Sequence, residues 1–150
     1  MSENLNNDEL IALAREVLAI ESRAVDSLRT RLDDDFAAAC NLIDNTPGRV
    51  VVTGMGKSGH ISSKIAATLA STGTPAFFMH PAEASHGDLG MITAHDLVIA
   101  LSNSGETSEI NLLLPLLKRI GIPLLALTGN PASTLARSAN IHLDVSVARE

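Results

Sequence analysis

Apolar and charged positions near the start of the chain alternate with a helical period. Apolar residues recur every three or four positions over residues 10–28, with charged residues between them, which is the pattern of an amphipathic helix. A second helix is predicted over residues 33–45, because Pro47 and Gly48 follow it and oppose helical structure. The sequence therefore predicts an N-terminal helical segment, residues 1–45, that packs on the domain after it.

From residue 50 onward, short apolar runs alternate with longer segments of helical character. The runs are apolar throughout, as expected of parallel strands that are covered on both faces. The segments between them suit crossover helices, and Pro115 should kink the one over residues 106–120 or loosen one of its turns. Residues 46–150 are therefore expected to form an α/β fold, a doubly wound five-stranded parallel sheet with flanking helices. The predicted strands are 50–53, 76–79, 97–101, 123–127 and 141–145, and the predicted helices are 58–71, 106–120 and 131–139.

Composition narrows the classes of partner and cofactor. The chain has 150 residues, a net charge of -6, 2% aromatic residues and neither Trp nor Tyr. We do not expect this protein to bind nucleic acid, because a nucleic-acid-binding protein requires a basic surface and often aromatic side chains on which bases stack. Cys40 is the only cysteine and the histidines show no paired spacing, so we expect no disulfide and no metal site. Without a signal-peptide pattern or an apolar run of about 18 residues, we expect a cytoplasmic protein that does not span a membrane.

The last predicted strand lies close to the end of the chain. No helical segment follows it before Glu150, so one sheet edge and one apolar face would lack a cover. Intact domains usually protect such edges. We therefore expect this sequence to be part of a longer protein.

The first motif is the glycine-rich turn TGMGKSGH, which follows the first predicted strand. Gly54, Gly56 and Gly59 have the spacing of a dinucleotide-binding turn, but the second strand ends in FFMHP and lacks the acidic residue that would hold a ribose. The turn also resembles the end of a P-loop, but Val51 stands at the leading glycine position and no strand ends in a Walker-B aspartate. Both nucleotide interpretations are weak. A tight turn without a ligand is one alternative, whereas Lys57 beside a helix N-terminus favours an anion site.

The second motif, LSNSGETSE, follows the third predicted strand. It places four hydroxyl side chains around Gly105 where a helix begins and backbone N–H groups lack partners, which suits a phosphate monoester. A single serine there could equally be a helix N-cap. Glu106 and Glu109 fall in the first predicted helical turn, where a carboxylate meets the positive end of the helix dipole, and we assign Glu106 this structural role.

Four stretches together resemble one known family: GMGKSGH, FFMHPAEASHGDLGMI, SNSGETSEI and LTGNPASTLA. They resemble the sugar isomerase (SIS) domain of the bacterial D-arabinose 5-phosphate isomerases over residues 49–150. SNSGETSE alone indicates a SIS domain, and HPAEASHGDLGMI indicates the arabinose phosphate branch. The resemblance implies interconversion of D-ribulose 5-phosphate and D-arabinose 5-phosphate, a step toward the Kdo sugar of lipopolysaccharide. It also implies no nucleotide or redox cofactor, and a homotetramer with active sites at subunit contacts.

The resemblance also implies catalytic residues. Moving a proton between C1 and C2 through an enediol requires a base, a group that stabilises the oxyanion, and a means of opening the sugar ring. Lys57, Glu109 and Glu150 match the family's proposed catalytic positions, and His86 matches a residue near its active site. Our hypothesis makes Glu150 the base, Lys57 the group that stabilises the enediolate, and Glu109 a positioning or proton-shuttling group. A lone loop histidine is often only a hydrogen-bonding strut, so that alternative for His86 stays open. The predicted substrate- and phosphate-binding residues are Gly56, Ser58, Ser102, Asn103, Ser104, Thr107 and Ser108.

The sequence also departs from the family. Members continue with further helices, a histidine in an SHPGG stretch and usually paired CBS domains, so we expect these 150 residues alone to be inactive or poorly soluble. A non-catalytic sugar-phosphate sensor, like the SIS domains of some transcription regulators, is the main alternative, and a SIS isomerase for a hexulose or heptose phosphate is another. A sensor needs no lysine or glutamates beside the serine loop, so the matched positions favour the enzyme.

Overall fold

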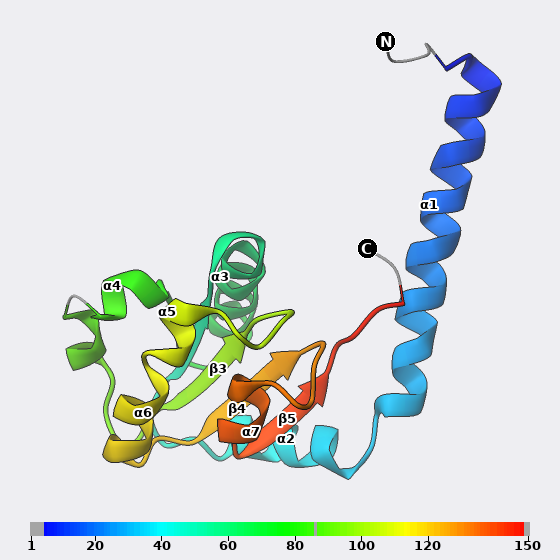
Figure 1. Cartoon of the computed structure of the whole chain (residues 1–150). Helices are drawn as coiled ribbons and strands as arrows, with labels where there is room; N and C mark the ends of the chain where they lie inside the picture. The colour runs from blue at the N-terminus through cyan, green and yellow to red at the C-terminus, as the bar shows by residue number, and fades with distance from the viewer. Residues whose placement is uncertain (1–4, 86, 149–150) are drawn as a thin grey trace. The chain divides into compact units, whose positions relative to one another are not determined.

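The computed structural model describes residues 5–85 and 87–148 (Figure 1). These residues fall into two compact units. One comprises residues 33–146, and the other is built on the residues up to Leu32.

The N-terminal unit contains one long helix, α1 (Asn7–Ser27), followed by a 3-10 turn, Leu28–Arg31. A capping box starts α1: the Asn6 side chain accepts the Glu9 N–H at 3.0 Å, and the Glu9 carboxylate accepts the Asn6 N–H at 2.8 Å. The amphipathic helix predicted from the pattern is confirmed, and it begins earlier because of this cap. None of the residues of α1 is buried. Among the described residues, no helix has both the length and the apolar character needed to cross a membrane.

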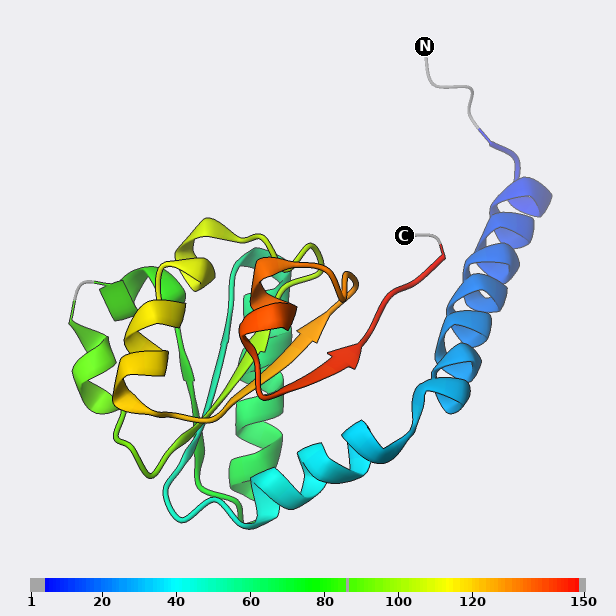
Figure 2. The same cartoon turned by 60° about the horizontal axis from the view of Figure 1, so that its bottom comes forward.

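The larger unit is organised around a parallel sheet with helices packed against it (Figure 2). Its five strands lie in the order β2-β1-β3-β4-β5. Every predicted strand is confirmed to within one residue at each end. Because the order changes direction between β1 and β3, the loops after these two strands diverge at the carboxyl edge, which is where ligands bind in such sheets. The strands are β1 (Val50–Gly54), β2 (Ala76–Met79), β3 (Leu97–Leu101), β4 (Leu124–Thr128) and β5 (Ile141–Asp144).

Helices cover both faces of the sheet, which confirms the doubly wound prediction. Val50 and Val52 belong to the cluster beneath α2 (Asp34–Asp44) and α3 (Gly56–Ser71). Val51 belongs to the opposite cluster, which the remaining helices cover. Those helices are α4 (Pro81–Ser85), α5 (Ser108–Asn111), α6 (Leu114–Ile120) and α7 (Thr134–Ser138). Helix α2 thus packs with the sheet, and the expected packing of the whole segment 1–45 on the domain stays a prediction.

The helix predicted over residues 106–120 is wrong as a single element. It consists of α5 and α6, and Pro115 lies in the first turn of α6, where the missing proline N–H breaks no intrahelical bond. The proline therefore lies at the start of a new helix. It does not kink a continuous one, and the alternative of a loosened turn agrees with the break between α5 and α6. Two further elements, α4 and the 3-10 turn Asp88–Met91, carry too few residues to show a period.

A buried carboxylate holds the amino edge of the sheet together. Asp96 is 2% exposed and accepts hydrogen bonds from the N–H groups of Arg49 at 2.7 Å and Thr93 at 2.8 Å, and from the Thr93 hydroxyl at 3.1 Å. The Arg49 guanidinium lies 3.4 Å from the same carboxylate and stacks on Phe77. Burial raises the pKa of Asp96, but these hydrogen bonds outweigh it and hold the pKa below its usual value.

Candidate functional site

Two glycines bring the start of α3 close against the end of β1. A Cβ on Gly59 would lie 2.7 Å from the Gly54 carbonyl oxygen, and a Cβ on Gly54 would lie 2.9 Å from the Ser58 carbonyl oxygen. Gly56 has open space around it but a φ of 53°, which disfavours other residues. The glycine spacing therefore has a packing and turn-forming role.

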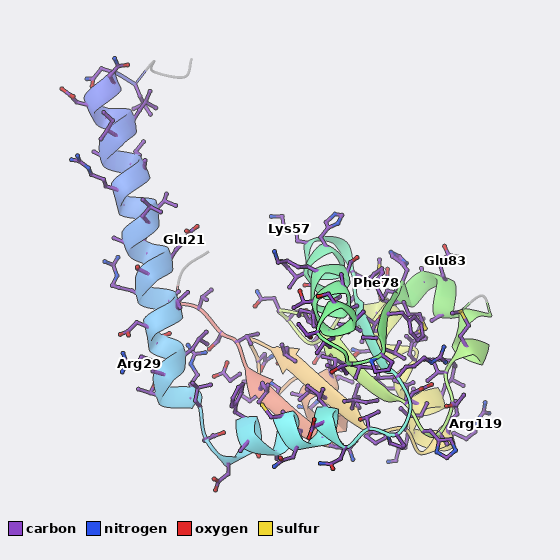
Figure 3. The ribbon with its side chains drawn as sticks, turned by 180° about the vertical axis from the view of Figure 1, so that it is seen from behind. Glu21, Arg29, Lys57, Phe78, Glu83 and Arg119 are labelled. Carbon is purple, nitrogen blue, oxygen red and sulfur yellow. The ribbon has the colours of Figure 1, made fainter. Side chains whose placement is uncertain are left out.

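The same turn leaves backbone donors available at the N-terminus of α3. The first N–H groups of a helix have no partner within it, and Met55 at the N-cap position makes no side-chain hydrogen bond to them. Lys57 lies in this first turn with an exposed side chain, as Figure 3 shows. N–H groups and an ammonium group together form a suitable site for an anion.

The loop after β3 is closed by its own hydroxyl groups. Ser102 Oγ accepts the Gly105 N–H at 3.0 Å and shares a hydrogen bond of 2.8 Å with Thr107 Oγ1. Ser104 Oγ accepts the Glu106 N–H at 3.1 Å, and Gly105 has a φ of 66°. Ser102 is buried, so its hydroxyl braces the loop from inside, whereas Ser104 is exposed.

The surroundings of Glu109 favour the ionised form of its carboxyl group. Its own backbone N–H and then the Ser108 hydroxyl, which donates to Glu109 Oε2 at 2.8 Å, lower the pKa of Glu109, while burial opposes them. The imidazole of His80 adds a weaker attraction that lowers the same pKa. His80 follows β2 and accepts the Ala82 N–H on Nδ1 at 3.3 Å. In the sequence pattern His80 is an isolated histidine, although its place directly after a strand could have indicated this edge of the sheet.

The structure brings most of the predicted site residues to one edge. Gly54 and Leu101 are paired in the register of β1 and β3, so the residues after them begin side by side. Two of the predicted catalytic residues, His86 and Glu150, lie outside the described residues, and their roles stay predictions. The predicted residues that share this edge are Gly56, Lys57 and Ser58 after β1 and Ser102, Asn103, Ser104, Thr107, Ser108 and Glu109 after β3.

The structural role expected for Glu106 needs a correction. Helix α5 begins at Ser108, so Glu106 is not in its first turn. Instead Glu106 Oε1 accepts the Thr134 N–H at 2.6 Å, at the start of α7, and Oε2 accepts from Asn111 Nδ2 at 3.4 Å. The carboxylate therefore meets the N-terminus of a helix that is distant in the sequence.

One groove among the described residues lies away from this edge. It has a volume of about 640 Å³ and lies between α6 and α7, with Lys118 and Arg137 among its lining residues and none of the predicted site residues that the structure describes. In the part of the chain that the structure describes, no three His, Cys, Asp or Glu side chains are grouped to hold a metal ion.

Comparisons with known proteins agree with this architecture. The arabinose 5-phosphate isomerase KdsD of Pseudomonas aeruginosa PAO1 is 61% identical over 150 residues, which is all of this chain and 45% of that protein. KdsD of Escherichia coli K12 is 57% identical over 136 residues, 91% of this chain and 42% of that protein. The solved structure of E. coli CFT073 c3406, a complex with arabinose 5-phosphate, superposes with a TM-score of 0.92 at 44% identity, over 97% of this chain and 78% of that one.

The chain thus spans less than half the length of these curated relatives. The family model of the SIS domain matches residues 43–150, which include the whole sheet and both loops at its carboxyl edge. This chain belongs to the SIS domain family.

Proposed function

We propose that the full-length protein is an aldose–ketose isomerase that interconverts D-ribulose 5-phosphate and D-arabinose 5-phosphate through an enediol. One observation carries the proposal: the uncapped N-terminus of α3, with Lys57, begins beside the hydroxyl-rich loop 102–108 at the point where the strand order changes direction. The 61% identity to a named arabinose 5-phosphate isomerase supports this choice of substrate. The resemblance to that branch assigns the product to Kdo and lipopolysaccharide synthesis.

In the proposed scheme one set of groups binds the phosphate of the substrate, and a second set acts at its reacting carbons. The first-turn N–H groups of α3 and the exposed hydroxyls of loop 102–108 bind the phosphate, which fixes the open-chain sugar along the edge. Lys57 stabilises the oxygen that becomes negative when the proton leaves C1 or C2. Glu109, with its lowered pKa, is ionised at neutral pH and can accept or relay a proton. Glu150 is the proposed base.

The test is an isomerisation assay on the full-length protein with a panel of pentose, hexose and heptose phosphates, read by NMR. We expect interconversion of the two pentose phosphates alone and, in D₂O, deuterium in the product at the carbon that receives the proton. Binding without turnover would assign the protein to the sensor class, and turnover of a hexulose or heptose phosphate alone would assign another substrate. We propose that the 150-residue chain is inactive in this assay.

We also propose that the protein self-associates, as the tetramers of the family imply, through the apolar stripe of α1. Leu10, Leu13 and Val17 lie along this stripe and are 51%, 46% and 52% exposed. Clustered exposed apolar side chains of this kind favour association. Leu13→Glu with Val17→Glu is expected to convert the oligomer to a smaller species in light scattering after size exclusion. Arg15→Glu, on the opposite side of the helix, is the control, and an unchanged mass in the double variant would contradict the proposal.

A further inference from the structure

Loop 102–108 is fastened to the first turn of α7. The Leu135 N–H donates to the Gly105 carbonyl oxygen at 3.1 Å, and the Thr134 N–H donates to Glu106 Oε1 at 2.6 Å. Gly105 also lies directly against Ser133, because a Cβ on this glycine would overlap the serine side chain. One side of the loop therefore rests on α7.

Helix α7 is a firm support for the loop. Ser133 and Leu135 are both 0% exposed, and Leu135 belongs to the apolar cluster beneath α5 and α6. Ser133 Oγ accepts the Ala136 N–H at 3.3 Å and so caps the helix. Close-packed side chains of this kind hold one arrangement. The contacts with α7 therefore connect the loop to the core.

Glu106 connects this support to a predicted phosphate ligand. Its side chain accepts from Thr134 and Asn111, whereas its own N–H donates to Ser104 Oγ at 3.1 Å. A charged acceptor makes such hydrogen bonds stronger than neutral ones. The Thr134 N–H, followed by the Thr134 hydroxyl, lowers the pKa of Glu106, so the carboxylate is ionised at neutral pH. A displacement of Glu106 would move the Ser104 hydroxyl with it.

We propose that Glu106 is a positioning residue for sugar-phosphate binding, whose carboxylate ties loop 102–108 to α7 and holds the Ser104 hydroxyl where a phosphate monoester binds. This inference rests on the proposed function of the loop. Glu106 has no contact with the reacting carbons in this scheme. Its loss therefore weakens substrate binding and leaves the chemical step nearly unchanged.

The hydrogen bond from the Thr134 N–H to the Glu106 carboxylate can be removed by changing either residue. Glu106→Ala removes the acceptor, and Glu106→Gln keeps an amide oxygen in its place. Thr134→Pro removes the donor, and the helix tolerates it because Thr134 is the first residue of α7 and Ser133 has the extended conformation (φ -70°, ψ 161°) that a following proline requires. Thr134→Ser keeps both the N–H and the hydroxyl and is the matched control.

For Glu106→Ala in the full-length protein we expect a KM for D-ribulose 5-phosphate about tenfold higher, with kcat within about threefold of the wild type. Thr134→Pro should give the same rise, and Glu106→Ala with Thr134→Pro no more than either alone, because both remove one interaction. Glu106→Gln should recover most of the affinity, and Thr134→Ser should match the wild type. If a thermal melt shows that Thr134→Pro is not folded at the assay temperature, the KM values of Glu106→Ala and Glu106→Gln test the proposal without it.

A normal KM in Glu106→Ala, or additive effects in the double variant, would overturn the proposal. So would a fall in kcat as large as the fall in kcat/KM, because that result assigns Glu106 to the chemical step. Failure of the proposed function is distinguishable, since it appears in the wild type as an absence of isomerisation. The variants are then compared by calorimetric titration with D-ribulose 5-phosphate, and equal Kd values for wild type and Glu106→Ala, or no binding by either, overturn the inference.

Discussion

Replacing Lys57 with alanine is expected to lower kcat for D-ribulose 5-phosphate isomerisation by about 10² to 10³-fold, the effect of removing one group that stabilises a developing oxyanion. The side chain is exposed and lies in the first turn of α3, so its loss opens no cavity in the core. Thermal unfolding of the variant should therefore match the wild type. Steady-state kinetics on the full-length protein measure the effect.

Lys64 provides the matched control for this prediction. It is a second exposed lysine of α3, well away from the N-terminal turn. Lys64→Ala should keep wild-type kcat and KM, whereas Lys57→Arg, which keeps the charge and changes the geometry, should recover only part of the lost rate. A kcat near the wild-type value in Lys57→Ala would remove Lys57 from the catalytic scheme.

Replacing Asp96 with alanine is expected to destabilise the fold by about 3 kcal/mol, because it removes the buried carboxylate that accepts part-buried hydrogen bonds from the N–H groups of Arg49 and Thr93. For the unfolding of a single domain of 150 to 250 residues that loss corresponds to a fall in Tm of roughly 6–12 °C. Thermal and urea unfolding of the full-length protein measure it. Asp26→Ala is the control, since Asp26 pairs with Arg29 through side chains that are 75% and 81% exposed, and it should change stability by less than about 0.5 kcal/mol.

The contribution of Asp96 to the stability of the fold should decrease in acid. Its pKa is lower in the folded state than in the unfolded chain, so the ionised carboxylate stabilises the fold above its unfolded pKa. This contribution is lost as the pH falls through the lowered folded pKa. The difference in Tm between the wild type and Asp96→Asn should stay constant near neutral pH and narrow below about pH 4. A difference that widens in acid would contradict the assigned hydrogen bonds.

Much of the fold could be predicted because its signals are local. Val50, Val51 and Val52 are each 0% exposed, and a strand buried on both faces appears in the sequence as a continuous apolar run. The glycine turn and the hydroxyl-rich loop were also recognisable, because each consists of neighbouring residues. The placement of Lys57 near the loop followed from the rule that parallel strands end at one edge of a sheet.

Other features could not be predicted because their partners are distant along the chain. Glu106 and Thr134 are 28 residues apart, and Arg49 and Asp96 are 47 apart, so neither pair shows in a local pattern. The local pattern favoured a dipole role for Glu106 in its own helix, and the observed contact with α7 overrides it. His80 and Glu109, whose electrostatic attraction lowers the pKa of Glu109, are likewise far apart along the chain.

The sequence by itself determined which segments become strands and helices and which side chains are candidates for binding a phosphate, since apolar periodicity, glycine turns and hydroxyl-rich loops act over a few consecutive residues. Only the tertiary structure decided that β3 lies between β1 and β4, and hence that loop 102–108 rests on α7 with Glu106 between them. The physical reason is that strand order and buried hydrogen bonds depend on how covered faces pack together, a free-energy balance over the whole chain that no short segment contains.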